Sequence, residues 1–331
     1  MESLYCVENL NVSLPLRGQP LHIVRGVSLE VGRGEALGIV GESGSGKSVL
    51  AMSLIGLLPK SAKVTSDRMD FLGQDLTGDR GRRLGKLRGR SIAMVFQDPM
   101  TSLNPLLSIG EQLTEAYRLR TRASAKQAAE RAAYVLERVG ISDPKTRLRQ
   151  YPHNLSGGMR QRVVIAMALM EQPDLIIADE PTTALDVSTQ AQILALLHDL
   201  RQEFGLSIIV NTHDLNLVSQ LVDRIAVMYA GNIVECGPTA DILRQPSHPY
   251  TKALLSCAPR HGQQEHGTPL GTIPGIVPSL LGKIDGCSFA DRCERAVDEC
   301  RSLEMRDFMA APSWQHRCLR GPGAPLEDTK I

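Results

Sequence analysis

The sequence has few aromatic residues, almost no net charge and no long apolar run. Aromatic residues make up 4% of the 331 residues, and 37 basic residues face 36 acidic ones, for a formal net charge of +1. A charge so close to zero gives no overall attraction to nucleic acid or to anionic lipid. The longest apolar runs, such as Val163–Met170, are far shorter than the roughly 20 residues that a helix needs to cross a bilayer. Composition therefore predicts neither a nucleic-acid-binding protein nor a membrane-spanning one.

The first residues also lack the features of a secretory signal. The opening segment MESLYCVENLNV has two acidic residues and no basic stretch ahead of an apolar core. We therefore expect a soluble cytoplasmic protein, in which disulfides are disfavoured. Cysteines number only seven, yet four of them cluster near the end of the sequence, at Cys287, Cys293, Cys300 and Cys318. In a reducing compartment, such a cluster indicates metal ligands or reactive thiols.

Apolar strands alternate with helical segments over most of the chain. Runs typical of strands occur at residues 26–31, 36–40, 91–97, 174–179, 207–213 and 224–231. A helix is predicted over residues 48–58, ending before Pro59. Between residues 108 and 140, apolar residues at spacings of three and four predict an amphipathic helical insert. This alternation predicts an α/β fold with a mainly parallel sheet covered on both faces.

The character of the sequence changes near residue 260. Residues 267–283, GTPLGTIPGIVPSLLGK, are rich in glycine and proline and should be extended and loop-like. We therefore predict a main domain over residues 1–260, with a helical subdomain at approximately residues 98–160. Residues 261–331 form a second, loop-rich region with few large apolar side chains, which could hardly fold alone.

A glycine-rich segment, GESGSGKS at residues 41–48, fits the pattern G-x-x-x-x-G-K-[ST] between a predicted buried strand and a predicted helix. Its glycines let backbone N–H groups turn inward around phosphates, and the start of the helix adds a partial positive charge. Lys47 would reach the β- and γ-phosphates, and the Ser48 hydroxyl would hold Mg²⁺. The predicted nucleotide-binding residues are Gly41, Ser43, Gly44, Ser45, Gly46, Lys47 and Ser48.

Two acidic residues end the predicted strand LIIADE, at residues 175–180. Asp179 stands at the carboxyl end of the strand, where a carboxylate suits Mg²⁺ coordination, directly or through water. Glu180 beside it could polarise an attacking water molecule. The alternative for Glu180 is a solvated carboxylate before a proline turn.

A second candidate anion site lies in LSGGMRQ, at residues 155–161. Ser156, Gly157 and Gly158 precede a strongly helical segment, so their N–H groups can bind an anion. One nucleotide already has its phosphates held by the first glycine-rich loop. A second phosphate-binding helix start on the same chain therefore suggests a site that is completed across a dimer.

Taken together, these motifs resemble those of the ATP-binding subunits of ABC transporters. In the family's order, GESGSGKS matches Walker A, VFQDP the Q-loop, LSGGMRQ the signature, LIIADE Walker B, TALD the D-loop and NTHD the switch histidine. The match covers roughly residues 1–260. It implies a P-loop NTPase fold with a helical signature subdomain, and ATP and Mg²⁺ as ligands.

The resemblance also implies roles for single residues. It assigns catalysis to Glu180, His213 and Gln97, and Mg²⁺ binding to Ser48, Gln97 and Asp179. It assigns contact with the partner's nucleotide to Ser156, Gly157, Gly158 and Gln161, and a bridge to the opposite subunit to Asp186. Gln97 would also couple the ATPase to the permease, and His213 would contact the γ-phosphate.

Two positions need comment. Taken alone, His213 after an apolar strand is more typical of a packed core or helix-capping residue, and only the surrounding motifs reverse that interpretation. Many members of the family stack the adenine on an aromatic residue shortly after the first strand, whereas Leu14 stands at the corresponding place here. Adenine contact is therefore expected to be weaker, or to come from another residue.

Further phrases resemble the oligopeptide and dipeptide importer branch, which also includes nickel and glutathione importers. They are QDPMTSLNPL, EPTTALDV and HPYTKALL, together with a C-terminal G-C-x-F…R-C…C…C pattern at Gly286–Cys318. Asp291 and Glu294 replace prolines that are usual in that pattern. The branch implies an ATPase that powers peptide import at the cytoplasmic face of the inner membrane. Its expected partners are two permease subunits, a second ATPase subunit and, indirectly, an extracytoplasmic solute-binding protein. The branch more often implies a heterodimer of paralogous ATPase subunits than a homodimer. No nucleic acid is expected as a partner.

The cysteine intervals are C-x5-C-x6-C-x17-C. They differ from the closer pairs of structural zinc sites and from the bacterial ferredoxin run. Spacing alone leaves a [4Fe–4S] cluster, Zn²⁺ and unligated thiols open. Because some members of the branch bind an iron–sulfur cluster here, the resemblance favours [4Fe–4S], with Zn²⁺ as the alternative, as a structural staple for the tail.

Two rival functions are weaker. Non-transport ABC ATPases of DNA repair or translation commonly carry a long coiled-coil insertion or two cassettes, and this chain has one cassette with a short insert. A catalytically dead partner subunit is disfavoured by Glu180, His213 and an intact LSGGMRQ.

Overall fold

The structure, a computed structural model, describes residues 2–79, 81–183, 185–257 and 272–325. The chain divides into two compact units. The first unit comprises Met1–Gly32, Ala36–Gly81 and Thr212–Ile331, and the second comprises Arg33–Glu35 and Arg82–Asn211. The domain boundary expected near residue 260 falls in the segment 258–271, outside the described residues.

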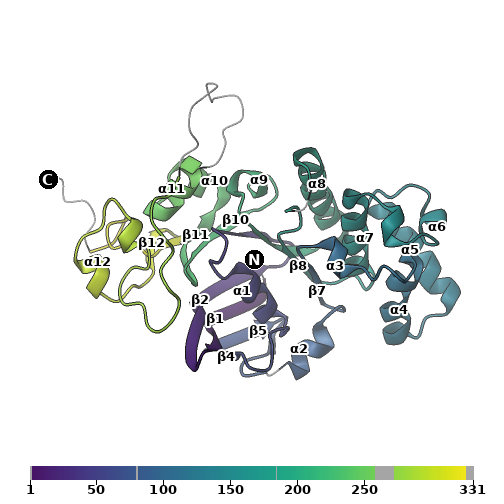
Figure 1. The fold of residues 1–331 in the computed structure, drawn as a ribbon, viewed down its shortest axis with the longest axis horizontal. Coiled ribbons are helices and arrows are strands. Elements are labelled where there is room, and N and C mark those ends of the chain that lie inside the picture. Colours follow the sequence, from purple (N-terminus) through teal and green to yellow (C-terminus); the bar gives the residue numbers. More distant parts are fainter. Residues whose placement is uncertain (1, 80, 184, 258–271, 326–331) are drawn as a thin grey trace. The chain divides into compact units, whose positions relative to one another are not determined.

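An antiparallel sheet opens the first unit (Figure 1). Its strands are β1 (Ser3–Leu16), β2 (Gln19–Gly32), β4 (Lys63–Thr65), β5 (Arg68–Phe71) and β6 (Gln74–Asp75). They are ordered β2-β1-β5-β6, and β4 pairs with another part of β1. The β1–β2 hairpin turns at Arg17 and Gly18, which both have positive φ, 50° and 82°. Positive φ at both central residues is typical of the type I′ turn, whose twist matches that of the two strands.

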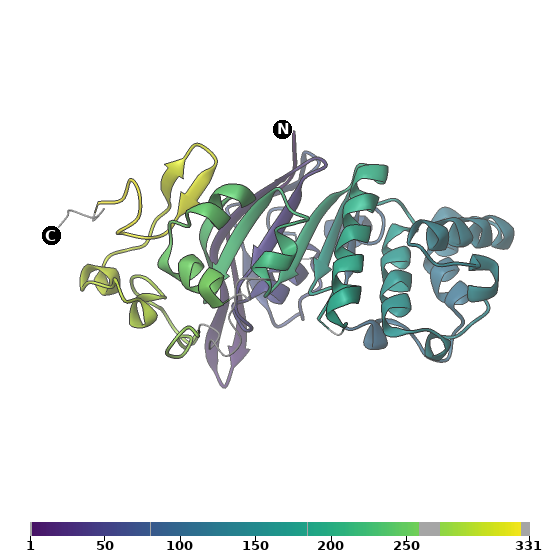
Figure 2. The ribbon, with the colours of Figure 1, turned by 90° about the horizontal axis from the view of Figure 1, so that it is seen from above.

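A second sheet in the first unit carries the candidate phosphate-binding loop. Its strands are β3 (Ala36–Val40), β10 (Arg224–Tyr229), β11 (Asn232–Pro238), β12 (Phe308–Ala311) and β13 (Trp314–His316), in the order β12-β13-β11-β10-β3. β3 and β10 are parallel, and every residue of β3 is buried, as expected for a strand covered on both faces. The tail adds β13 to the edge of β11, and Figure 2 shows the tail strands in yellow.

Short helices complete the first unit. They are α1 (Lys47–Leu54), α9 (Leu215–Val218), α10 (Thr239–Arg244), α11 (Pro249–Cys257), η2 (Ala290–Arg292) and α12 (Glu299–Ser302). The helix expected over residues 48–58 therefore ends earlier, at Leu54. Gly56 adopts a left-handed φ of 65°, and Leu57 N–H donates back to the carbonyl of Met52 at 2.9 Å. A glycine in this conformation ends the helix four residues before the expected end.

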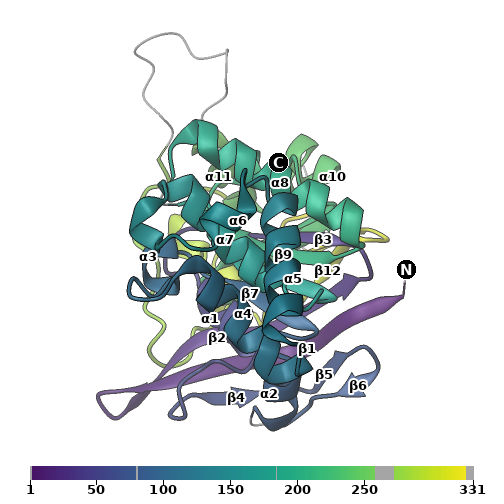
Figure 3. The same ribbon diagram turned by 90° about the vertical axis from the view of Figure 1, so that its right-hand side faces the viewer.

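Three parallel strands lie in the second unit, ordered β9 (Ser207–Thr212), β8 (Leu175–Asp179) and β7 (Ile92–Val95). The helices are α2 (Arg82–Leu87), α3 (Pro99–Ser102), α4 (Ile109–Thr121), α5 (Ala125–Arg138), α6 (Pro144–Arg147), η1 (Pro152–Asn154), α7 (Gly157–Leu169) and α8 (Val187–Phe204). Figure 3 shows α4, α5 and α7, which pack against one another.

The amphipathic insert expected between residues 108 and 140 is two helices. Ser108 with Glu111 and Ser124 with Gln127 form the capping boxes that start α4 and α5. The apolar positions that predicted the insert, Ala128, Ala132, Val135, Leu136 and Val139, are all buried. The expected α/β class is confirmed. Among the described residues, no helix combines the length and apolar character needed to span a membrane.

Candidate functional site

The loop between β3 and α1 is shaped by glycines. Gly44 and Gly46 have φ values of 78° and 108°, which side chains rarely adopt. A Cβ atom on Gly41 would lie 2.1 Å from the carbonyl oxygen of Met228. A Cβ atom on Gly46 would lie 2.7 Å from the carbonyl oxygen of Ile23. The loop therefore packs so closely against neighbouring backbone that no side chain fits at either position.

Two buried polar side chains belong to this loop. Lys47 is buried, and its ammonium donates to the carbonyl oxygens of Gly41 at 2.7 Å and Glu42 at 3.1 Å. Ser45 is also buried, and its hydroxyl has no hydrogen-bond partner within the described part of the chain. A buried hydroxyl without a partner costs free energy unless a ligand satisfies it. A phosphate oxygen fits this combination of an ammonium, an unsatisfied hydroxyl and the start of a helix.

Two residues far away in sequence also contact the loop, and sequence reasoning missed both. The Tyr250 hydroxyl accepts a hydrogen bond from the backbone N–H of Glu42 at 2.9 Å. Arg292 donates to both carboxylate oxygens of Glu42, at 2.7 and 3.0 Å. The only available signals were that Tyr250 lies in HPYTKALL and that Arg292 stands directly before Cys293.

In the second unit, the structure brings Gln97 and Glu180 together after β7 and β8. The Glu180 carboxylate accepts from Gln97 Nε2 at 3.1 Å and from the Thr183 hydroxyl at 2.8 Å. Glu180 has a φ of 46°, an uncommon left-handed conformation for a residue that is not glycine. Its backbone N–H donates to the carbonyl of Asn211 at 2.9 Å. The catalytic carboxylate expected from the sequence is therefore held by both its side chain and its backbone.

Asp179, beside it, is buried at the end of β8. Its Oδ1 accepts a hydrogen bond from the side-chain amide of Asn211 at 2.9 Å. Sequence reasoning missed Asn211 and Thr183, although both are polar residues next to a motif that it had identified. An acidic residue oriented by a neighbouring amide suits coordination of Mg²⁺.

The signature segment begins α7. Ser156 caps the helix, with its hydroxyl accepting from Met159 N–H at 3.3 Å, and both Ser156 and Gly157 are exposed. Gly158 is half-buried, whereas Gln161 is fully buried. The first two residues of the segment Ser156–Gly158 are therefore open at the surface of this chain, whereas Gln161 is enclosed within it.

Asp186, His213 and Leu14 are the remaining positions that the sequence singled out. Asp186 caps α8, and its carboxylate accepts from the Ser188 hydroxyl at 2.7 Å and from Thr189 N–H at 3.0 Å. These hydrogen bonds, that from Ser188 first, lower the pKa of Asp186 to about 2. His213 follows β9 and is exposed. Leu14 pairs with Leu21 in the β1–β2 hairpin.

The four clustered cysteines all line one small cavity in the first unit, together with residues such as His248, Phe289 and Arg320. None of the seven cysteines, all of which lie in the described part of the chain, forms a disulfide. Burial raises the pKa of Cys287 to about 12, and it also raises the pKa values of Cys293 and Cys318. Four cysteines around one cavity fit a thiolate-ligated centre in number and type. In the described ranges, no group of three or more His, Cys, Asp or Glu side chains is arranged to hold a metal ion.

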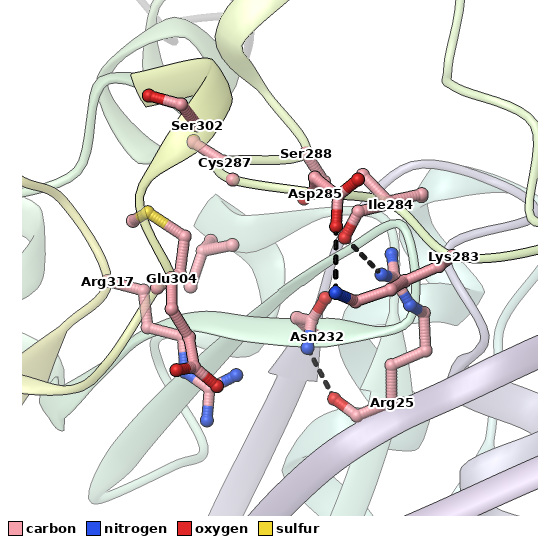
Figure 4. Close-up of a pocket in the computed structure, with 13 residues that line it drawn as sticks. Arg25, Asn232, Lys283, Ile284, Asp285, Cys287, Ser288, Ser302, Glu304 and Arg317 are labelled. Carbon is pink, nitrogen blue, oxygen red and sulfur yellow. Dashed lines mark hydrogen bonds and ion pairs between the residues drawn. The ribbon is translucent and has the colours of Figure 1, made fainter. Parts of the chain in front are cut away.

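A larger cavity, of about 320 Å³, lies where the tail passes β2 and β11 (Figure 4). Arg25 donates to the carbonyl of Ile284 at 3.1 Å, and Lys283 forms an ion pair with Asp285 at 2.9 Å. The side chain of Asn232 donates to the carbonyl of Arg25. The first of these contacts attaches the tail to β2, the second lies within the tail, and the third joins β11 to β2. The cavity carries both positive and negative side chains and contains no residue of the glycine-rich loop.

Comparisons with known proteins agree with this geometry. Residues 24–183 match the family model "ABC transporter", and residues 234–300 match "Oligopeptide/dipeptide transporter, C-terminal region". The dipeptide transport ATP-binding protein DppD of Bacillus subtilis is 50% identical over 301 residues, which cover 91% of this chain and 89% of the relative. DppD of Escherichia coli is 44% identical over 326 residues, 98% of each chain. A solved dimeric ATP-binding cassette with bound ADP and Pi has a TM-score of 0.62 at 28% identity, covering 71% of this chain and 99% of that one.

Proposed function

Because this chain belongs to the oligopeptide and dipeptide family of ABC transporter ATP-binding subunits, we propose that it hydrolyses ATP to drive peptide import through a separate membrane permease. The observation that carries the proposal is the glycine-rich loop, with buried Lys47 and a Ser45 hydroxyl that has no hydrogen-bond partner among the residues the structure describes. The peptide cargo, di- or oligopeptides, follows from the names of the relatives and from the C-terminal family match.

The motif residues have the following proposed roles. Lys47 and the loop from Gly41 to Ser48 bind the phosphates, since inward N–H groups and an ammonium stabilise their negative charge. Glu180 accepts a proton from the attacking water, and Gln97, hydrogen-bonded to Glu180 at 3.1 Å, orients that carboxylate. His213 contacts the γ-phosphate. The proposed ligands of Mg²⁺ are Ser48, Gln97 and Asp179, and the ion would neutralise charge on the phosphates.

A second ATPase subunit is part of the proposal. The exposed start of α7 offers the N–H groups of Gly157 and Gly158 to an anion, although this chain already has a phosphate-binding loop. The solved relative with bound ADP and Pi is dimeric. We propose that Ser156, Gly157 and Gly158 complete the partner's site and that Asp186 lies at the same interface. A paralogous heterodimer is the proposed form.

The proposed permease contact includes the Q-loop glutamine, Gln97. Three large apolar side chains are exposed in this short segment, namely Phe96 at 41%, Met100 at 61% and Leu106 at 82%. Exposed apolar side chains of this size favour a surface that another protein covers. We therefore place the permease contact at residues 96–106, which would hold the chain at the cytoplasmic face of the inner membrane. The solute-binding protein would act indirectly, through the permease.

We place the nucleotide-binding domain at residues 1–260, its helical subdomain at approximately residues 98–160 and the cysteine-containing region at residues 261–331.

The four cysteines that share one cavity are the proposed ligands of a metal centre, [4Fe–4S] or, alternatively, Zn²⁺. Such a centre would cross-link four points of a loop-rich tail and hold it folded. No chemical step of ATP hydrolysis needs it.

The function is tested with the full chain and with the chain assembled with its permease. The wild type should bind ATP with Mg²⁺ and, when assembled, hydrolyse it in step with uptake of a labelled dipeptide. Lys47→Ala should abolish both activities, whereas Lys60→Ala, which removes an exposed lysine near the same helix, should leave them unchanged. If nickel or glutathione stimulated hydrolysis and peptides did not, the transported substrate would be that solute rather than a peptide. Wild-type protein without ATP binding would refute the proposal.

A further inference from the structure

Arg292, in the cysteine-containing tail, uses every N–H group of its guanidinium. Nη1 donates to Glu42 Oε2 at 2.7 Å and to the Tyr229 hydroxyl at 3.3 Å. Nη2 donates to Glu42 Oε1 at 3.0 Å and to the carbonyl of Ile273 at 3.0 Å. Nε donates to the carbonyl of Pro274 at 2.9 Å. With five N–H groups satisfied, the guanidinium is fixed in one orientation.

The surroundings of Arg292 distinguish it from an ordinary surface cation. Its side chain is only 5% exposed, and its guanidinium carbon lies 5.7 Å from the centre of the Tyr229 ring and 6.0 Å from that of Phe289. By contrast, Arg301 in the same tail forms an ion pair of 3.4 Å with Asp291, and its side chain is 51% exposed. Exposed pairs of that kind contribute little, whereas two-pronged Arg–carboxylate pairs are strong and specific.

Glu42 connects this contact to the phosphate-binding loop, because it is held at three points. Its carboxylate binds Arg292, its N–H donates to the Tyr250 hydroxyl at 2.9 Å, and its carbonyl accepts from the Lys47 ammonium at 3.1 Å. Tyr250 packs in turn against Tyr229 and Phe289, with ring centres 4.6 and 5.3 Å away. A single aromatic cluster therefore supports both the loop and the tail arginine.

The pair also matters electrostatically. The Glu42 carboxylate is 27% exposed and belongs to the loop that has to receive a polyphosphate. Like charges repel at close range, most strongly where water is partly excluded. Arg292 compensates this carboxylate, so that the loop does not present a negative charge of its own to the nucleotide.

We propose that Arg292 is a positioning residue for nucleotide binding: acting through Glu42, it fixes and neutralises the first half of the phosphate-binding loop. The inference rests on the ATPase function proposed above. The tail therefore takes part in nucleotide binding although it contributes no group that touches ATP. The effect falls on affinity rather than on chemistry, since Arg292 acts through the loop that binds the phosphates.

The test measures binding of ATP with Mg²⁺ to the full chain by isothermal titration calorimetry. Arg292→Ala should raise the Kd about 10-fold, because the loop loosens and Glu42 is left unpaired. The double variant Arg292→Ala with Glu42→Gln should recover part of that loss, since the uncompensated charge is gone. Arg301→Ala, the matched control in the same tail, should bind as the wild type does. In the assembled transporter, Arg292→Ala should raise the KM for ATP while the kcat at saturating ATP stays near normal.

Two results would overturn the inference: wild-type affinity in Arg292→Ala, or a double variant that binds no better than Arg292→Ala. A purely structural arginine would give no such rescue by Glu42→Gln. If circular dichroism shows that Arg292→Ala is misfolded, the single variant Glu42→Gln tests the proposal instead, because it removes the loop's partner in the Arg292–Glu42 ion pair. It should weaken binding by about three-fold, a change of about 0.7 kcal/mol, and unchanged affinity would refute the role. A wild-type chain that binds no ATP would instead remove the proposed function, and this inference with it.

Discussion

Replacing Glu180 by Gln separates the chemical step from the fold. The variant keeps the size of the side chain, and its carbonyl oxygen can still accept from Gln97 and from the Thr183 hydroxyl, which now lie 3.1 and 2.8 Å from the carboxylate. The backbone N–H that donates to Asn211 is also unchanged. Because these contacts survive, the variant should fold and bind ATP normally. It loses only the ability to accept a proton.

Loss of a general base lowers turnover by about 10²–10⁴-fold. At about 1.4 kcal/mol per factor of ten, this corresponds to a barrier about 3–6 kcal/mol higher. Thr183→Val is the matched control, since it removes one hydrogen bond to the same carboxylate and leaves the base in place. One hydrogen bond contributes about 1 kcal/mol, so this control should slow turnover by only about five-fold.

The assay is phosphate release by the assembled transporter at saturating ATP, together with ATP binding by each variant. Glu180→Gln should accumulate an ATP-bound form of the complex, and Thr183→Val should not. Near-normal hydrolysis by Glu180→Gln would show that another group accepts the proton. Equal losses in the two variants would show that the hydrogen-bond network matters, rather than the base.

Three further predictions concern other sites. In Gly157→Asp the new side chain fits its own helix, because a Cβ atom there lies 3.6 Å from Leu185 Cδ2, so the variant should still bind ATP in calorimetry. It should fail to pair with a second ATPase subunit in ATP-dependent gel filtration, because its carboxylate would repel the partner's nucleotide phosphates. Cys300→Ser should make the tail sensitive to protease while Lys47-dependent ATP binding persists, with a Kd raised no more than the about 10-fold expected of Arg292→Ala. Iron with sulfide, or one zinc, in the anaerobically purified wild type supports a metal centre, and four freely alkylated thiols exclude it. The hydrogen bonds that lower the pKa of Asp186 to about 2 also stabilise the folded protein. This stabilisation is present above about pH 3.9, the pKa of the carboxyl in the unfolded chain, and is lost as the pH falls towards 2. The difference in Tm between the wild type and Asp186→Asn should therefore shrink over that range, and a constant difference would contradict this assignment.

The parts of the fold that could be predicted are those encoded by adjacent residues. β3, and β8 up to its final Asp179, are runs of apolar residues, all of them buried, and such runs are typical of strands covered on both faces. The loop after β3 could be predicted because its glycines and Lys47 act within eight consecutive residues. The pairing of Gln97 with Glu180 was implicit in the strand pattern, because the carboxyl ends of neighbouring parallel strands meet.

Other parts depend on contacts between distant segments. The long strands β1 and β2 were largely missed, because many of their positions are polar or half-exposed and their turn at Arg17 and Gly18 is a weak signal. The ion pair between Arg292 and Glu42 joins residues 250 positions apart, and neither side chain is unusual in its own segment. Spacing and periodicity report on local geometry only, so no local pattern could have paired them.

The strand that the tail adds to β11 affects where the protein can safely be shortened. The family match ends at residue 300, yet β13, which covers the edge of β11, lies at Trp314–His316. Trp314 also donates to the buried carboxylate of Glu235 at 2.8 Å. A chain cut at residue 300 would leave the backbone donors and acceptors of β11 open to any other strand, and uncovered edges of this kind nucleate aggregation. The last strands thus protect solubility, and a stable truncated protein has to extend beyond His316.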